Sequence, residues 1–265
     1  MHQIFAIART ALCIAFFFYA SWSDYKTREV SNKVWILLAP PAFILTIIDL
    51  FFDGNLEQLL LYGLCFGLTS AFAIILFYSG GFGGADSKAL MCLALALPFY
   101  PEIFQPLTGT PSPISQIFFP ITIFSNAVLF AAATAIYLLF YNIVWRWRTG
   151  KRLFEGYEEA SLGKKILVML TGYKISIDKL KSKWHIYPME NLEENTSKRT
   201  LLLTPKDEVR EAIVQKLEKA VEERKIDNSF WATPGLPMLI FITVGLILAL
   251  ILDNIVWLCI RLLIG

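Results

Sequence analysis

Two aspartates stand out because each lies where an apolar segment meets a polar one. Asp24 follows a stretch without charge that begins after Arg9, and Asp86 precedes another apolar stretch. Two carboxyl groups a few ångström apart share one proton, because both cannot ionise readily. The ionised member can then take a proton from a bound water while the protonated member polarises a peptide carbonyl. The two aspartates therefore fit the chemistry of an aspartyl protease, which needs no covalent intermediate and no metal.

Other chemistries find little support in the residue pattern. There is no CxxC pair and no histidine at ligand spacing, so we expect no metal site, no disulfide framework and no cofactor. Four cysteines lie singly in apolar segments and are expected to be packing residues: Cys13, Cys65, Cys92 and Cys259. The net charge is only +2, and the basic residues of the polar segment are mixed with acidic ones. We therefore expect no nucleic-acid partner.

Glycines gather immediately before the second aspartate, in the run Gly80-Gly81-Phe82-Gly83-Gly84-Ala85. Glycine permits positive φ and the close approach of another chain, so an extended peptide could lie beside the carboxylate. A plain turn between two helices is the alternative, and it is favoured if the glycines are taken alone. Lys88, two residues after Asp86, either tunes the aspartate pair or anchors a helix at the membrane interface.

The elements that must position these aspartates are predicted to be membrane helices. The chain has 265 residues, of which 56% are hydrophobic and 17% charged, and its mean hydropathy is +0.55. Residues 146–230 hold 18 of the 24 Lys and Arg and 14 of the 22 Asp and Glu, so the rest is too apolar for a water-soluble surface. A crossing helix needs about 20 apolar residues. This predicts six spans, near 2–23, 34–52, 58–85, 89–104, 118–145 and 234–252.

The fold expected is thus an all-α membrane protein with a small α+β domain between helices 5 and 6. We divide the chain into a membrane domain at 1–145, a polar domain at 146–230 and the last helix at 231–265, which completes the membrane domain. The proline-rich stretch 106–120 is expected to be a loop or re-entrant segment. The first apolar segment lacks a small-residue cleavage signature and is expected to be a retained helix.

Charge in the short loops predicts the orientation. If the chain crosses six times, one side of the membrane holds the loops 24–33 and 79–88 and the polar domain. That side has eight Lys and Arg close to the membrane, whereas the other side has only Arg9 and Arg261. Positive charge marks cytoplasmic loops. Both termini are therefore expected outside, with Asp24, Asp86 and the polar domain on the cytoplasmic side of the cell membrane. Carboxylates at a membrane boundary are costly and tend to be functional.

The polar domain has structure signals of its own. Its β-branched and aromatic residues between 164 and 187 predict strands. A helix start is predicted at Thr204-Pro205, followed by acidic residues. One apolar face then repeats every four residues, at Val209, Ile213, Leu217 and Val221. We prefer a structural cap over a separate ligand-binding domain.

Three segments resemble a family of membrane proteases. The hexapeptide from Gly83 to Lys88, GGADSK, resembles the GxGD motif of aspartyl proteases that act in membranes, although Ala85 stands at the second motif glycine. Residues 24–32, DYKTREVSN, resemble the first-aspartate loop of the prepilin peptidases in that group. The heptapeptide WATPGLP at 231–237 is similar to the entry of the last helix in archaeal preflagellin peptidases. The resemblance covers all six spans and is weakest over the polar domain.

This resemblance implies a catalytic pair and a substrate class. Asp24 and Asp86 would be catalytic, and Gly83, Gly84, Ala85 and Lys88 would form the motif that the substrate approaches. The family removes short basic leader peptides from preflagellin and type IV prepilin-like precursors at the cytoplasmic membrane face. The methylating domain of bacterial members is rich in cysteine pairs that this chain lacks, so we expect cleavage without N-methylation and an archaeal source. The oligomeric state stays open.

Two alternative functions remain at the level of sequence. A protease of the signal-peptide-peptidase type would cut inside membrane helices, but those relatives embed the first aspartate within a helix. A proton-coupled transporter would use Asp24 and Asp86 as proton relays. Transporters commonly carry internal repeats and charges near the bilayer midplane, and neither is evident here.

Overall fold

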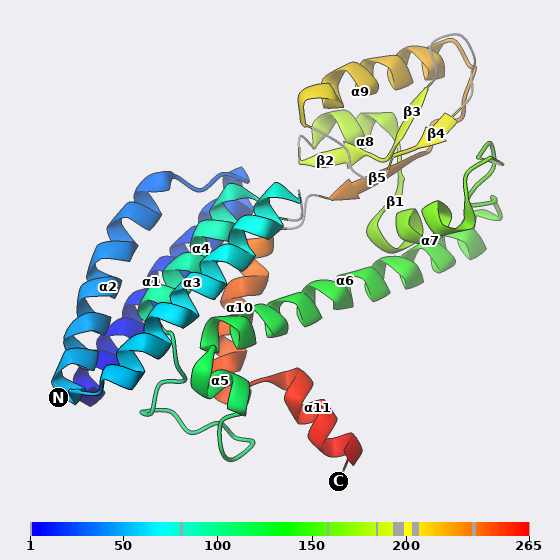
Figure 1. Cartoon of the computed structure of the whole chain (residues 1–265). Coiled ribbons are helices and arrows are strands. Elements are labelled where there is room, and N and C mark those ends of the chain that lie inside the picture. Colours follow the sequence, from blue (N-terminus) through cyan, green and yellow to red (C-terminus); the bar gives the residue numbers. More distant parts are fainter. Residues whose placement is uncertain are drawn as a thin grey trace. The chain divides into compact units, whose positions relative to one another are not determined.

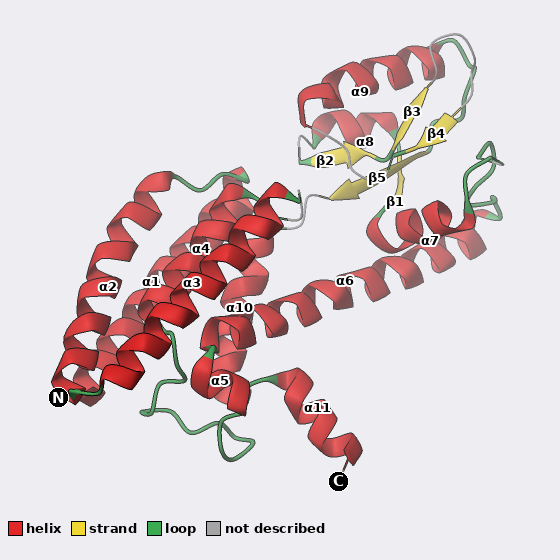
Figure 2. Ribbon diagram, in the orientation of Figure 1, coloured by secondary structure: helices red, strands yellow, loops and turns green. Residues whose placement is uncertain are grey.

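The structure, a computed structural model, describes residues 2–79, 82–157, 159–183, 185–192, 199–202, 207–234 and 237–264. The chain divides into two compact units. Unit 1 comprises Met1–Ala131 and Pro237–Gly265, and unit 2 comprises Ala132–Leu236. Within the described residues, all strands lie in unit 2 (Figure 2), whereas unit 1 is helical.

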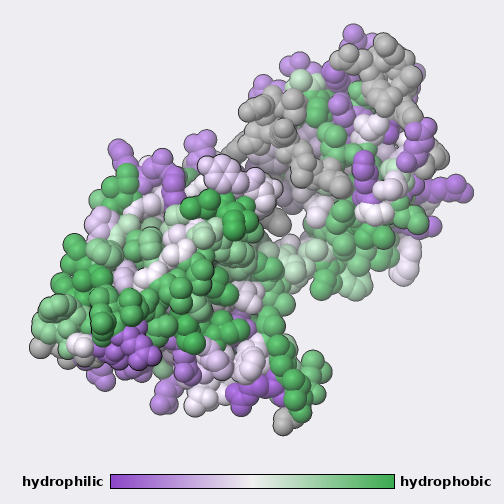
Figure 3. Space-filling model, in the orientation of Figure 1, coloured by the Kyte–Doolittle hydropathy of each residue, from purple (hydrophilic) through white to green (hydrophobic). Residues whose placement is uncertain are grey.

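Unit 1 is a bundle of helices (Figure 1). Its helices are α1 (His2–Thr27), α2 (Asn32–Asp53), α3 (Leu56–Tyr78), α4 (Gly84–Ala96), α5 (Pro113–Ile117), the first part of α6 (Phe119–Thr149), α10 (Met238–Leu252) and α11 (Ile255–Ile264). In the described chain, α1, α2, α3 and α6 are long and apolar enough to cross a membrane, and the bent pair α10–α11 makes five such spans if counted as one. On the face that Figure 3 shows, this unit has an apolar middle and hydrophilic residues at both ends. The chain is therefore a multi-pass membrane protein.

The fourth predicted span is a shorter helix than expected. We expected a crossing near 89–104, but α4 ends at Ala96. Its 13 residues rise about 20 Å, less than the roughly 30 Å of hydrocarbon in a bilayer. Ala96 is the last helical residue because Leu97 precedes Pro98, and a proline disfavours helical backbone in the residue before it. The count of six long spans is thus not reproduced by the described helices.

Helix α4 is instead the centre of the bundle. It packs against α1, α2, α3 and α10. Its side chains are almost completely buried at Ala89, Leu90, Cys92 and Leu93. A helix covered on all sides by other helices is apolar all round, which is why its hydropathy alone resembles that of a membrane span.

The last predicted span also differs from the expectation. Residues 231–234 form part of a strand rather than a helix entry, and α10 begins only at Met238. The chain then breaks between α10 and α11, whose axes differ by 47°. Asp253 has a φ of +61° at this break and is buried. Its carboxylate accepts a hydrogen bond from the Ser112 N–H at 2.5 Å and another from the Ser115 hydroxyl.

One glycine allows α10 to lie directly on α6 within unit 1. A Cβ atom at Gly245 would lie 2.9 Å from the backbone nitrogen of Ala127 and would also collide with the carbonyl oxygen of Ile123. Real Cβ atoms do not approach backbone atoms so closely. The contact between the two helices therefore depends on the absence of a side chain at this position.

Unit 2 is the small α+β domain that the sequence predicts. Its elements are α7 (Leu162–Thr171), β1 (Tyr173–Ile175), α8 (Ile177–Ser182), β2 (Ile186–Pro188), β3 (Glu190–Leu192), β4 (Arg199–Leu201), α9 (Asp207–Glu222) and β5 (Phe230–Pro234). The sheet has the order β1-β5-β2 with antiparallel neighbours, and β3 and β4 form a separate antiparallel pair.

Helix α9 bears the apolar face that we predicted, because Ile213 and Leu217 are buried in the domain core. The predicted helix start at Thr204-Pro205 lies outside the described residues. The stretch 164–187 yields β1 and the first part of β2, together with α7 and α8, which we did not predict.

Candidate active site

Asp24 lies in the last turn of α1 and is half-buried. Its carboxylate accepts a hydrogen bond from the backbone N–H of Leu239, in the first turn of α10. The charge of Arg28 also acts on it. Arg28 has a φ of +57°, and its N–H donates to the Asp24 carbonyl at 2.9 Å, which ends the helix. The Leu239 N–H and the charge of Arg28 partly offset the desolvation of the half-buried Asp24 carboxylate, which is the larger effect.

A buried polar cluster fixes α10 against α1 one turn before Asp24. The Ser21 hydroxyl donates to the Leu239 carbonyl at 3.0 Å and lies 2.6 Å from the hydroxyl of Thr243. The Thr243 hydroxyl in turn lies 3.2 Å from the Phe17 carbonyl. Because these contacts hold the first turn of α10, they also hold the Leu239 N–H that faces Asp24.

Asp86 lies in the first turn of α4 and is also half-buried. Its Oδ2 accepts a hydrogen bond from the N–H of Gly83 at 3.0 Å. The Ser87 hydroxyl donates to the Gly83 carbonyl at 3.2 Å. The second aspartate is thus held by the N-terminus of its own helix, the end at which a negative charge is favoured.

The glycines of the motif have different structural roles. Gly83 has an ordinary φ of −73°, but a Cβ atom there would lie 3.1 Å from Asp86 Oδ2. A side chain at Gly83 would therefore crowd the carboxylate, whereas the backbone conformation there is open to any residue. A Cβ atom at Gly84 would meet only a ring carbon of Phe77, at 3.6 Å, an ordinary contact. Ala85 packs partly against the core of unit 1, while Gly80 and Gly81 lie outside the described residues.

The two predicted aspartates lie at the same end of unit 1, in the last turn of α1 and the first turn of α4. The negative charge of Asp24 acts on Asp86, so the two carboxylates lie within electrostatic range of each other. The end of α1 and the starts of α4 and α10 lie at the same end of the bundle (Figure 1). No cluster of histidine, cysteine, aspartate and glutamate that could hold a metal ion occurs in the described part of the chain. The arrangement can activate a water molecule by acid–base chemistry with its own carboxyl groups.

The side chain of Lys88 reaches another helix. Its Nζ donates a hydrogen bond of 2.6 Å to Oδ1 of Asn32, the first residue of α2. The sequence motifs include both residues, but the sequence alone does not predict that they meet.

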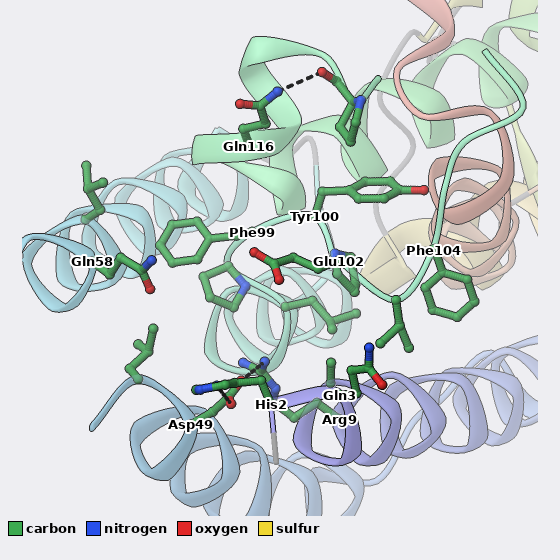
Figure 4. A pocket seen from close by; sticks show the side chains of 18 of the residues that line it. His2, Gln3, Arg9, Asp49, Gln58, Phe99, Tyr100, Glu102, Phe104 and Gln116 are labelled. Carbon is green, nitrogen blue, oxygen red and sulfur yellow. Dashed lines mark hydrogen bonds and ion pairs between the residues drawn. The ribbon is translucent and has the colours of Figure 1, made fainter. Parts of the chain in front are cut away.

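A cavity of about 680 Å³ lies at a different place in unit 1 (Figure 4). His2, Arg9, Asp49 and Glu102 are among the residues that line it. Within it, Asp49 forms an ion pair with Arg9 at 2.5 Å, and its Oδ1 lies within hydrogen-bond distance of His2 Nδ1, at 2.8 Å. Arg9 precedes Asp24 by 15 residues of α1, or about 22 Å along the helix axis. The cavity is therefore separate from the aspartate pair.

Sequence reasoning missed the pairing of Arg9 with Asp49, although a signal was present. Each is a lone charge in an apolar segment, one early in the first segment and one late in the second. Two successive membrane helices run antiparallel, so the start of one meets the end of the next. The ion pair neutralises both charges at that end of the bundle.

Unit 2 contains a second buried polar group that the sequence did not reveal. Glu190 is fully buried in β3. Both of its carboxylate oxygens accept hydrogen bonds from Arg199, at 2.9 and 3.0 Å, and one also accepts from the Trp231 N–H at 2.9 Å. The Tyr157 hydroxyl donates to the same carboxylate. These partners satisfy a charge that would otherwise be costly to bury.

Lys174 of β1 lies beside this group and is buried between two aromatic rings. Its Nζ is 5.1 Å from the centroid of Tyr157 and 4.9 Å from that of Trp231. Burial, with a smaller contribution from the charge of Arg199, lowers the pKa of Lys174 to about 6. Burial likewise raises the pKa of Glu190 to about 7, against the opposing effect of Arg199. Both groups belong to the core of unit 2.

Two family models match this chain and together cover most of it. The model of the type IV leader peptidase family matches residues 11–140, a range that includes Asp24 and Asp86. The model of the archaeal peptidase A24 C-terminus, type II, matches residues 164–255. The chain belongs to the type IV leader peptidase family. The resemblance drawn from the sequence motifs is thereby confirmed, and this leader peptidase family member is a protease.

Two relatives are similar to this leader peptidase over most of its length. The preflagellin peptidase of Methanococcus voltae is 27% identical over 241 residues, which are 86% of this chain and 88% of that protein. The preflagellin peptidase of Methanococcus maripaludis strain C6 is 25% identical over 241 residues, or 89% and 90% of the two chains.

Proposed function

We propose that this protein is an aspartyl endopeptidase that removes the short basic leader peptide from preflagellin or type IV prepilin-like precursors. The observation that carries the proposal is that Asp24 and Asp86, which belong to two different helices, lie within electrostatic range of each other. Each carboxylate accepts a backbone N–H from the first turn of a helix. The family match and the names of the two relatives support the choice of leader peptides as the substrate class.

The proposed reaction uses one proton shared by the pair. The ionised carboxylate takes a proton from a water molecule, and the water oxygen attacks the scissile carbonyl carbon. The protonated carboxyl group gives its proton to the carbonyl oxygen, so a tetrahedral diol forms. The diol then collapses: the ionised carboxylate takes a proton from one diol hydroxyl, the C–N bond breaks, and the protonated carboxyl group gives its proton to the leaving nitrogen. The products are a carboxylic acid and an amine, and the pair again holds one proton. The two groups titrate together and have no separate roles at rest.

The membrane arrangement forms part of the proposal. The short helix α4 and the irregular chain after it complete a sixth crossing, so both termini lie outside. The aspartate pair and the polar domain, 146–230, then lie at the cytoplasmic side, where the leader peptide of a precursor is found. A phosphatase fused after the last residue should be active outside the cell, and one fused at Gly156 in unit 2 should be inactive. The opposite pattern would refute this topology.

The first test is cleavage of a precursor by membranes that contain the wild-type protein. With an archaeal preflagellin, we expect a shortened product whose N-terminus begins directly after the basic leader. Mass spectrometry should show a free N-terminal amine without an added methyl group. A product cut inside the hydrophobic helix of the precursor would instead support a signal-peptide-peptidase activity. No cleavage of preflagellin or of a pilin precursor by correctly inserted protein would refute the proposal.

A further inference from the structure

We propose that Lys88 and Asn32 form a clamp that positions Asp86 opposite Asp24; the inference rests on the proposed proteolytic function. The bond between them links the first turn of α4 to the first residue of α2. Lys88 follows Asp86 by two residues, and side chains at that spacing on a helix do not face each other. With Lys88 bound to α2, the Asp86 side chain lies on a different side of α4, within electrostatic range of Asp24.

Asn32 is a firm attachment point because the connection before it is short and well bonded. The hydroxyl groups of Ser23 and Thr27, in the last turns of α1, both donate to the Glu29 carbonyl at 2.9 Å. The Ser31 side chain caps α2 by accepting the Lys33 N–H at 3.3 Å. The start of α2 is thereby tied to the end of α1 that carries Asp24.

Packing reinforces this connection one turn farther into α2. The ring of Trp35 is buried and lies 6.0 Å from that of Phe17 in α1, in an edge-to-face arrangement. Such aromatic pairs contribute beyond the area that they bury. Asn32 and Asp24 thus belong to one rigid corner formed by α1 and α2.

Within the described residues, the other hydrogen bonds of the first turn of α4 are local. The hydrogen bonds from Asp86 to Gly83 and from Ser87 to Gly83 lie within five consecutive residues. They shape the turn, while Ala85 and Ala89 pack in the core of unit 1. In the described part of the chain, the recorded side-chain hydrogen bond from this turn to another helix is the one between Lys88 and Asn32.

The bond is solvent-exposed, which makes the inference testable. Exposed charge-assisted pairs contribute little to stability, so their removal should leave the protein folded. The catalytic rate is more sensitive than stability to the loss of such a bond, because a displacement of a catalytic group by about 1 Å can reduce the rate about 100-fold. Lys88 and Asn32 are therefore positioning residues, expected to affect kcat more than stability or KM.

The test compares leader-peptide cleavage by Lys88→Met, Asn32→Leu and the double variant, all purified in detergent. Each single variant should lower kcat about 10- to 100-fold with KM within about twofold of wild type. The double variant should be no worse than the poorer single one, because the two changes remove the same bond. Lys88→Arg and Asn32→Asp retain a donor and an acceptor and should recover most of the rate.

Lys33→Met is the matched control. Like Lys88→Met, it removes one positive charge close to Asn32, but the Lys33 side chain takes no part in the bond between Lys88 and Asn32. Its cleavage rate should be close to that of wild type. Three results would overturn the clamp. The rate losses of Lys88→Met and Asn32→Leu could multiply in the double variant, or the variants could change KM alone. Lys33→Met could also lose as much cleavage rate as Lys88→Met. Failure of the wild type to cleave any leader peptide would instead refute the proposed function itself.

Discussion

Gly83 lies so close to the Asp86 carboxylate that a methyl group in its place would press on the oxygen that accepts its own N–H. This explains the glycine of the motif without reference to a bound substrate. Its neighbour Gly84 has room for a Cβ atom. Alanine substitutions at the two adjacent glycines therefore distinguish two effects. Both substitutions stiffen the turn, but only Gly83→Ala also crowds the carboxylate.

We predict that Gly83→Ala lowers the rate of leader-peptide cleavage about 10- to 100-fold by shifting the Asp86 carboxylate. Gly84→Ala should retain most of the activity, since its new methyl group makes only an ordinary contact with Phe77. Steady-state cleavage assays on both variants check this. Equal activities for the two would show that space beside Asp86 is not the reason for the glycine.

Lys174 gives a residue-scale prediction for the stability of unit 2. Its pKa is lowered to about 6 in the folded state, whereas an unfolded chain holds the proton up to about pH 10.5. Between these values the unfolded state binds more protons, so stability rises with pH. Glu190 has the opposite sign, because its raised pKa of about 7 makes stability fall from about pH 4.5 to 7. Above pH 7 only the effect of Lys174 remains.

The free energy of unfolding of unit 2 should therefore rise by about 2 to 3 kcal/mol between pH 7 and pH 9. Lys174→Met should remove this rise, and the exposed Lys179→Met should keep it. Hydrogen exchange of β1 and β5 in the full-length protein, measured at both pH values, reports the difference. A slope that survives in Lys174→Met would contradict the assignment.

The helices of unit 1 depend on close packing more than on helix propensity. At Gly245, the absence of a side chain lets α10 lie on the backbone of α6. The first turn of α10 in turn supplies the N–H that faces Asp24. A defect in this helix contact is thus expected to reach the aspartate pair.

Gly245→Ala should lower the free energy of unfolding by about 1 to 3 kcal/mol, because the new methyl group collides with Ala127 and forces the helices apart. Gly67→Ala, in α3, is the control: nothing lies within 4 Å of its added Cβ atom, and alanine favours a helix. Thermal unfolding in detergent compares the two. A Gly245→Ala variant as stable as Gly67→Ala would show that α10 and α6 are less tightly packed than described.

Element prediction from the sequence failed where packing, rather than composition, decides. Hydropathy identifies α1, α2, α3 and α6 as spans, but it does not separate a lipid-facing helix from α4, which is buried by its neighbours. Strand β5 was mistaken for a helix entry because its partners, β1 and β2, lie more than 40 residues away in the chain. Neither result follows from a local pattern of residues.

For the molecule as a whole, the distribution of charge predicts an apolar membrane part and one polar domain. The membrane character follows from 14 charges among the 180 residues outside 146–230. The motifs around Asp24 and Asp86 indicate the family, and the family models confirm it. What the sequence does not reveal is how distant side chains meet, such as Lys88 with Asn32 or Arg9 with Asp49. These pairs depend on the register between helices, which packing determines.

The most direct test of the central claim, that Asp24 and Asp86 act as one catalytic pair, is preflagellin cleavage by aspartate-to-asparagine variants. Asparagine keeps the size of the side chain but cannot share the proton. Asp24→Asn and Asp86→Asn should each lose at least about 1,000-fold in rate, and the double variant should be no slower than either single one. Glu57 is an exposed carboxylate in the first turn of α3, and the Glu57→Gln variant should cleave preflagellin at the wild-type rate. Near wild-type cleavage by either single aspartate variant, in protein that inserts and folds, would contradict the account.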